Sequence, residues 1–218
     1  GEGLTELYNG ISWTEVSDLN NARFGLAGLG LQTAALVAGG YQTAAIGNVE
    51  SWNGSAWTET TDLNTARHYA AGAGIQTAGL VFGGVILGNT EQWNGSAWTE
   101  VNDLNTARRY PGGTGADYTS VIAFGGNTSP GPSNNSALTE TWNGTSWTEV
   151  ADLNAGRNQM GSTSQDGDNT SALGFGGETA ASPPAPRTTN AELWNGTSWA
   201  EQNNLSQARN YVMGGGTA

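Results

Sequence analysis

The chain contains no cysteine and no lysine, and His68 is its single histidine. Without cysteine there is neither a disulfide framework nor a thiolate metal site, and cysteine usage gives no information about the redox compartment. With one histidine, metal sites built on a histidine pair are excluded. Enzymes that depend on a cysteine nucleophile or on paired histidine ligands are therefore ruled out.

Positive charge is also scarce. Seven arginines stand against 19 acidic residues, which gives a formal net charge of -12. Because nucleic-acid affinity comes mostly from lysine and arginine replacing counterions on phosphates, we expect no nucleic-acid partner. No apolar run approaches the ~20 residues that a membrane-spanning helix needs, so we expect no membrane insertion. The sequence begins Gly-Glu-Gly rather than with methionine, and we expect a processed product or part of a longer chain.

Glycine and tryptophan, by contrast, are abundant. The 34 glycines are about twice the average usage, and nine tryptophans accompany them. Disordered chains have few aromatic residues, so this composition indicates a folded protein. At 218 residues, the chain is long enough to bury roughly 70% of its unfolded surface. We therefore expect a substantial core.

An eight-residue motif recurs along the chain. The stretch WNGSAWTE occupies residues 52–59 and returns unchanged at residues 93–100, and three related octapeptides begin at Tyr8, Trp142 and Trp194. Their second tryptophans are Trp13, Trp57, Trp98, Trp147 and Trp199. These lie 44, 41, 49 and 52 residues apart, a period typical of a four-stranded propeller blade. Five repeats within one domain, residues 1–218, are therefore predicted.

Other features recur in phase with the octapeptide. An arginine follows each copy, at Arg23, Arg67, Arg108, Arg157 and Arg209. An apolar run ending in Gly-Gly follows four of these arginines. Each unit thus predicts four strands: a glycine-rich strand, the apolar strand, and two strands joined by Asn-Gly. We expect the first strands to line the axis, where Gly28, Gly30, Gly72, Gly74, Gly113 and Gly115 suit a crowded centre.

The Asn-Gly pair is the strongest short hairpin signal, because both residues accept the positive φ of a type I′ turn. A two-residue turn pairs Trp52 with Ser55 and Glu50 with Trp57, which places both tryptophans on one face of the sheet. Small residues cover the other face, so that stacked blades interlock. The repeat therefore predicts that Trp57, Trp98 and Trp147 are buried.

The Gly-Gly after an apolar strand, the later tryptophan and the arginine that opens the first strand together resemble kelch-repeat β-propellers, and more loosely the galactose-oxidase propeller. Arrays of this kind are also similar to repeat proteins of marine bacteria and phages. The resemblance spans nearly the whole chain and implies an all-β fold. It implies no function, because propellers host enzymes, lectins and scaffolds. The copper centre of galactose oxidase is excluded by the single histidine.

The count of units predicts a five-bladed β-propeller of four-stranded antiparallel blades, whereas kelch propellers usually have six or seven blades. The N-terminal half-unit LTELYNGISWTE and the C-terminal half-unit ARNYVMGGGTA would share one blade to close the ring. That shared blade is short of its second strand.

The repeated charges are interpreted as scaffold. A carboxylate that occurs once per blade, at Glu6, Glu50, Glu91, Glu140 and Glu192, is most simply paired with the repeated arginine. Asp166, Asp168 and Asn169 resemble part of a calcium loop, but the remaining spacing is missing and a polar turn is favoured. We therefore expect no catalytic residues, no metal and no cofactor.

The repeats differ from one another just after the arginine and just after the Gly-Gly, and both positions fall on one end of the propeller. Variable, aromatic loops on a rigid scaffold are typical of a recognition surface. The candidate ligand-binding residues are Phe24, His68, Tyr69, Arg109, Tyr110, Asn158, Gln159, Asn210 and Tyr211.

The sequence therefore favours a non-enzymatic binding module for a glycan or a protein, extracellular or part of a virion or surface assembly. A purely structural repeat domain, whose variable loops have no ligand, stays open as an alternative. An enzyme is the least favoured class, because no cluster of acid, base or metal ligands is visible.

Overall fold

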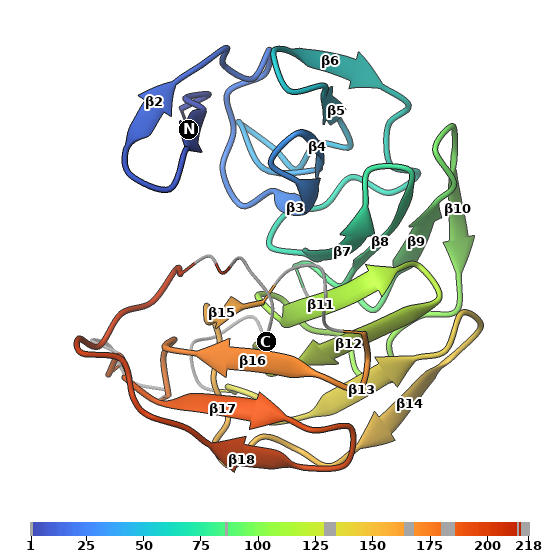
Figure 1. Cartoon of the computed structure of the whole chain (residues 1–218). Coiled ribbons are helices and arrows are strands. Elements are labelled where there is room, and N and C mark those ends of the chain that lie inside the picture. Colours follow the sequence, from blue (N-terminus) through green and yellow to red (C-terminus); the bar gives the residue numbers. More distant parts are fainter. Residues whose placement is uncertain are drawn as a thin grey trace.

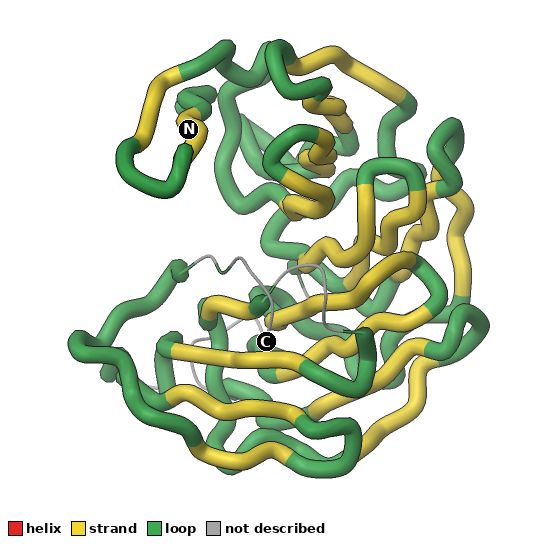
Figure 2. The backbone as a smooth tube through the Cα atoms, in the orientation of Figure 1, coloured by secondary structure: helices red, strands yellow, loops and turns green. Residues whose placement is uncertain are grey.

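The computed structural model of the chain describes residues 2–85, 87–128, 134–163, 168–179, 186–212 and 214. These residues contain 18 strands in five antiparallel sheets. They contain no helix, and hence none that is long and apolar enough to cross a membrane. The predicted all-β, propeller-like arrangement of five sheets is confirmed (Figures 1 and 2).

Four of the sheets are four-stranded meanders, which we call blades 1 to 4. Blade 1 comprises β3 (Ala27–Leu31), β4 (Ala34–Ala38), β5 (Val49–Trp52) and β6 (Trp57–Thr60). Blade 2 comprises β7 (Ala71–Ile75), β8 (Ala78–Phe82), β9 (Thr90–Trp93) and β10 (Trp98–Val101). Blade 3 comprises β11 (Gly112–Asp117), β12 (Ser120–Phe124), β13 (Thr139–Trp142) and β14 (Trp147–Val150). Blade 4 comprises β15 (Gly161–Ser162), β16 (Ala172–Phe175), β17 (Ala191–Trp194) and β18 (Trp199–Glu201).

The fifth sheet is a hairpin of β1 (Glu6–Tyr8) and β2 (Trp13–Glu15), which we call the N-terminal hairpin. It lies beside blade 1, where Trp57 Nε1 donates a hydrogen bond to Thr5 Oγ1 over 3.0 Å. The C-terminal segment, residues 205–212, lies beside blade 4, where Gly177 N donates to Arg209 O over 2.8 Å. The two half-units thus lie on opposite sides of the fifth blade position. The predicted closure of the ring by a blade shared between them is not seen among the described residues (Figure 1), where β1 pairs with β2 alone. The strand expected at the C-terminus falls largely on residues 213 and 215–218, outside the described residues.

The hairpin loops correct the predicted register. Trp52 pairs with Trp57 and Glu50 pairs with Glu59, so the loop between β5 and β6 has four residues rather than two. The reason is the side chain of Asn53, whose Oδ1 accepts hydrogen bonds from the amides of Ser55 and Ala56, both at 2.9 Å. The loop adds two residues, an even number, so the tryptophans still share a face as predicted.

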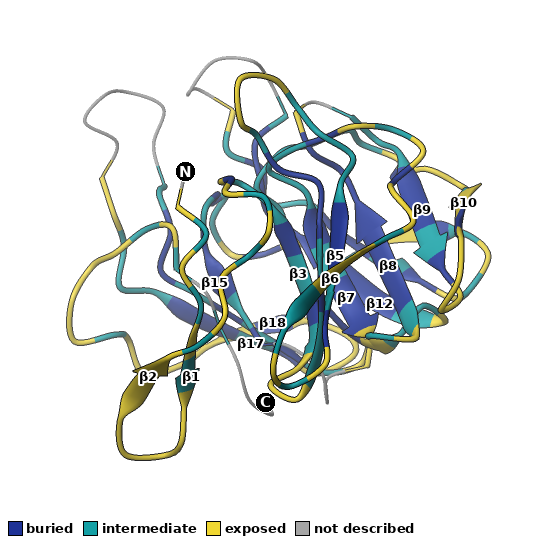
Figure 3. Cartoon of the chain, turned by 90° about the horizontal axis from the view of Figure 1, so that it is seen from above, coloured by how far each residue is buried: buried dark blue, intermediate teal, exposed yellow. Residues whose placement is uncertain are grey.

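The hairpin tryptophans join neighbouring blades. Trp147 and Trp98 are 5% and 6% exposed, and each donates its indole N–H to the preceding blade, Trp147 to Thr90 Oγ1 over 3.0 Å. Trp57 is only half-buried, although it occupies the same position in its unit. Figure 3 shows buried strands in the blades and exposed residues along β2. The predicted burial is therefore confirmed for Trp98 and Trp147 and is only partial at Trp57.

The repeated charges form one buried ion pair in each of blades 1 to 4. Arg23 Nη2 lies 2.8 Å from Glu50 Oε1, Arg157 Nη2 lies 2.6 Å from Glu192 Oε1, and both pairs have almost no exposed side-chain area. Arg67 with Glu91 and Arg108 with Glu140 repeat the arrangement. Burial lowers the pKa of each of these arginines, and the facing carboxylate opposes that shift. The pairs connect the segment before the first strand to the third strand, as expected of structural ion pairs.

The first strands of the blades face the axis. Of the six glycines predicted to line the axis, Gly28, Gly72 and Gly113 line the central channel, whereas Gly30, Gly74 and Gly115 are not among its lining residues. A Cβ atom at Gly72 would lie 2.8 Å from Gly28 O, and one at Gly113 would lie 2.5 Å from the ring of Phe82. Glycine is therefore required at Gly72, where two neighbouring first strands approach each other closely, and at Gly113, which packs against the second strand of blade 2.

Candidate functional site

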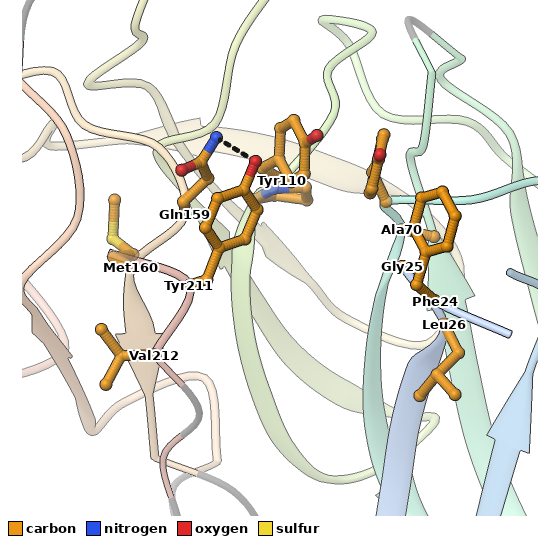
Figure 4. A pocket seen from close by; sticks show the side chains of 11 residues that line it. Phe24, Gly25, Leu26, Ala70, Tyr110, Gln159, Met160, Tyr211 and Val212 are labelled. Atoms are coloured by element: carbon orange, nitrogen blue, oxygen red, sulfur yellow. Dashed lines mark hydrogen bonds between the residues drawn. The ribbon is translucent and has the colours of Figure 1, made fainter. Parts of the chain in front are cut away.

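A cavity of about 470 Å³ opens at one end of the axis, and we call it the axial mouth. Each blade contributes the residues just after its arginine, and the C-terminal segment contributes Tyr211 and Val212 (Figure 4). The lining residues are Phe24, Gly25, Leu26, Tyr69, Ala70, Tyr110, Pro111, Gln159, Met160, Tyr211 and Val212. The lining is thus mostly apolar and aromatic, with one side-chain amide.

The second residue after each repeat arginine has the same unusual backbone conformation. Its φ is 60° at Tyr69, 55° at Tyr110, 53° at Gln159 and 51° at Tyr211, and Gly25 at 64° completes the set. Residues with a side chain rarely adopt this left-handed region, and such strain concentrates at binding and catalytic sites. Here hydrogen bonds between neighbouring units support it, from Tyr69 N to Gly25 O over 2.7 Å and from Tyr110 N to Tyr69 O over 2.8 Å.

The conformation arranges three tyrosines along one side of the mouth. The Tyr69 and Tyr110 ring centroids are 4.2 Å apart with the planes tilted by 31°, and Tyr211 meets Tyr110 edge-on at 5.9 Å. Gly25 leaves room for this arrangement, because a Cβ there would lie 2.6 Å from the Tyr69 ring. Burial, followed by hydrogen bonds with Tyr69 and Tyr211, raises the pKa of the Tyr110 hydroxyl above its ordinary value. Tyr110 therefore stays a neutral donor and acceptor.

Side-chain amides lie beside Tyr211, at one end of the row of tyrosines. Gln159 Nε2 donates to the Tyr211 hydroxyl over 3.0 Å, as the dashed line in Figure 4 shows. Asn210 Nδ2 donates to Gln159 Oε1 over 3.0 Å and also to a carboxylate oxygen of Glu178. A chain of hydrogen bonds thus holds Tyr211 and Gln159 in position. It begins at Glu178, which directly follows the Gly-Gly of blade 4.

Asn158 has a different role from its neighbour Gln159. It is buried, and its Nδ2 donates to Asn135 Oδ1 over 2.6 Å. Asn135 in turn donates to Glu178 O over 2.8 Å. Asn158 therefore ties the loop after blade 3's Gly-Gly to the loop after blade 4's, and its side chain does not line the mouth.

His68 lies behind the tyrosines. Its ring centroid is 4.8 Å from that of Tyr41 and 4.5 Å from that of Tyr69. Burial, and secondarily the charge of Arg109, lowers the pKa of His68 from its ordinary value of 6.5. His68 is therefore a neutral packing residue at neutral pH.

Protonation of His68 is expected to destabilise the fold. Because its pKa is lower in the folded than in the unfolded state, its contribution to stability is complete above about pH 6.5 and is lost as the pH falls through the folded-state pKa. Urea denaturation between pH 7.5 and 5.5 should show wild type losing more stability than His68→Gln. Equal losses in the two proteins would contradict this assignment.

The structure brings together five of the nine predicted site residues. Phe24, Tyr69, Tyr110, Gln159 and Tyr211 line the axial mouth. The other four, His68, Arg109, Asn158 and Asn210, lie next to these residues; Arg109 Cζ is 5.6 Å from the Tyr110 ring centroid. Sequence reasoning missed Leu26, Met160 and Val212, which form the apolar floor.

Tyr41 and Glu178 were also missed as individual residues. Each stands directly after a Gly-Gly, in the connections that vary between units. Phe24 forms an isolated β-bridge with Tyr41, and Asn158 forms one with Glu178. The connections that follow the two Gly-Gly pairs therefore contact the loops that follow the arginines. The predicted placement of both kinds of loop on one end of the propeller could therefore have identified them.

Asp168 begins a turn that its own side chain stabilises. Asp168 Oδ1 accepts a hydrogen bond from Thr170 N over 2.8 Å, and Asp166 lies outside the described residues. Among the described residues, no group of three or more histidine or acidic side chains is placed to hold a metal ion.

Comparison with known proteins gives no match, either to a protein-family model or to a curated sequence.

Proposed function

We propose that the chain is a non-enzymatic recognition module that binds a ligand, most favourably a glycan, in the axial mouth. The observation that carries the proposal is the ring of left-handed residues that directs Tyr69, Tyr110 and Tyr211 to one cavity. Maintaining this backbone conformation at non-glycine residues costs of order 1–3 kcal/mol each, so a functional role for these side chains explains why they are there.

The chemistry of the mouth supports a glycan. Aromatic faces stack on the apolar C–H faces of sugars, and side-chain amides and hydroxyls form hydrogen bonds with sugar hydroxyls. Both kinds of group are present and are already oriented by their mutual hydrogen bonds. A preformed site loses less conformational entropy on binding. A protein loop that inserts an apolar side chain is the alternative ligand, favoured by the apolar floor of Leu26, Met160 and Val212.

A non-enzymatic role is supported by the ionisable groups of the cavity. Among the described lining residues, these are only the three tyrosines. In blades 1 to 4, the repeated carboxylates and arginines that could serve as acids or bases are held in buried ion pairs. We further propose that the chain is itself a kelch-like propeller and that it belongs to an extracellular, surface or virion assembly.

The test is binding to a glycan array by the wild type and by the triple variant Tyr69→Asn, Tyr110→Asn, Tyr211→Asn. Asparagine tolerates the left-handed region, so the backbone is retained. We expect the triple variant to lose binding by at least a hundredfold, with a nearly unchanged melting temperature. Tyr8→Asn, on the N-terminal hairpin away from the mouth, is the matched control and should bind as wild type.

Two results would contradict the proposal. Undiminished glycan binding by the triple variant would remove the tyrosines from the site. Failure of the wild type to bind any glycan, and any protein offered in a pull-down, would favour the purely structural repeat domain.

A further inference from the structure

The N-terminal hairpin has a sheet edge without a partner. In each of blades 1 to 4 the third strand lies between the second and fourth, as β5 lies between β4 and β6. In the hairpin, β1 pairs with β2 alone among the described residues. The hairpin therefore consists of a third and a fourth strand, and no second strand pairs with the outer edge of β1, where the Tyr8 carbonyl accepts a hydrogen bond from Gln32 Nε2 over 2.6 Å.

A cavity of about 520 Å³ lies along this edge, between β1 and blade 1. We call it the hairpin cavity. Its walls include Leu7 and Tyr8 of β1, together with Leu31, Trp52 and Trp57 of blade 1. The volume falls within the range of about 300–1,000 Å³ that is typical of ligand sites.

The complete blades show what fills the corresponding space. Leu80 and Phe82 of the second strand β8 pack against Trp142 and Trp147 of the following blade. Leu36 and Ala38 of the second strand β4 pack in the same way against Trp93 and Trp98. The hairpin cavity adjoins the equivalent pair, Trp52 and Trp57, and the half-burial of Trp57 follows because no second strand covers it.

The buried ion pair shows the same incompleteness. In blade 1, Arg23 Nη1 donates to the carbonyl of Gly39, the first glycine after the second strand, over 3.2 Å, while Nη2 pairs with Glu50. The equivalent residues of the fifth position are Arg209 and Glu6. Both are exposed, and neither forms an ion pair among the described residues.

We propose that β1 and the hairpin cavity bind an extended peptide segment with the pattern of the repeat's own second strand, apolar-x-apolar-Gly-Gly, supplied from outside these 218 residues. The peptide pairs antiparallel with β1, as β8 pairs with β9. Its two apolar side chains, two residues apart, enter the cavity and contact Trp57. Its Gly-Gly reaches the space between Glu6 and Arg209. Addition of a strand to an open edge is a known mode of peptide recognition, in which backbone bonds give affinity and pockets give specificity.

The test uses a synthetic peptide with the sequence of residues 78–84, AGLVFGG, preceded by two lysines for solubility. The control peptide carries serine in place of the residues equivalent to Leu80 and Phe82. Binding is followed by tryptophan fluorescence, because Trp13 is 65% exposed and Trp57 half-buried. We expect a blue shift, a raised melting temperature, slowed amide exchange in β1, and at least tenfold weaker binding of the control peptide.

Two matched variants locate the site. Leu31 is 54% exposed and lines the hairpin cavity, whereas Ile75, its counterpart in blade 2, is 39% exposed and does not line it. Leu31→Arg should weaken peptide binding at least tenfold, and Ile75→Arg should leave it unchanged. Absence of binding, equal binding of the two peptides, or equal effects of the two variants would overturn the proposal.

This inference is independent of the axial mouth. The triple tyrosine variant should bind the peptide as wild type does, because none of its three residues lines the hairpin cavity. Loss of glycan binding with retained peptide binding, or the reverse, therefore tests the two sites separately. Loss of peptide binding in the triple variant would place the peptide at the axial mouth and overturn the hairpin site.

Discussion

Replacing Arg108 by methionine is expected to lower the free energy of unfolding by about 3–5 kcal/mol, the usual cost of removing one partner of a buried ion pair. Arg108 is fully buried, and its guanidinium bonds Leu138 O over 2.6 Å, Gly125 O over 3.2 Å and the carboxylate of Glu140. Methionine retains much of the apolar volume but leaves Glu140 buried without a cation. Chemical denaturation with urea measures the difference.

Two further variants separate the ion pair from general disruption. The double variant Arg108→Met, Glu140→Gln should recover part of the lost stability, because the buried charge is then removed. Arg209→Met changes the same position of the repeat where the arginine is exposed, and should alter stability by no more than about 0.5 kcal/mol. Equal destabilisation by Arg108→Met and Arg209→Met would show that the ion pairs are not what stabilises the blades.

Structural features that depend on residues recurring once in every unit could be predicted from the sequence. The phase of the tryptophans, arginines and Gly-Gly pairs predicted the five sheets, the shared face of Trp52 and Trp57, and the scaffold role of the charges. All of these depend on contacts that every complete unit makes in the same way. The predicted register of the hairpin around Asn53 was wrong, because the side-chain oxygen of Asn53 accepts hydrogen bonds from two backbone amides and stabilises a longer turn.

The candidate site was predictable only in part. Variation after the arginines identified Phe24 and the three tyrosines, and the structure places them together in the axial mouth. The left-handed backbone of the tyrosines is supported by hydrogen bonds between units, such as Tyr110 N to Tyr69 O, and no local sequence pattern predicts these bonds. The count of units predicted that the shared blade lacks its second strand, but it did not predict that the two half-units stay apart and leave the hairpin cavity open.

The hairpin tryptophans are expected to show graded effects on stability rather than equal ones. Trp147→Ala should cost about 3–5 kcal/mol, the range for removing a large buried aromatic side chain. Trp147 is 5% exposed, meets the Phe82 ring edge-on at 5.0 Å, and donates to Thr90 Oγ1. Its removal therefore takes away a contact across the boundary between blades 2 and 3 and leaves a cavity there.

The same substitution should cost less at Trp57 and least at Trp13, although the three residues occupy one position of the repeat. Trp57 is half-buried beside the hairpin cavity, and Trp13, on the open side of the ring, is 65% exposed. Because the apolar area removed from water falls along this series, the transfer and cavity contributions fall with it. Denaturation midpoints of the three alanine variants measure the order directly. If Trp13→Ala proved as damaging as Trp147→Ala, Trp13 would have to be buried in solution, which requires a ring that closes on the side where the structure is open.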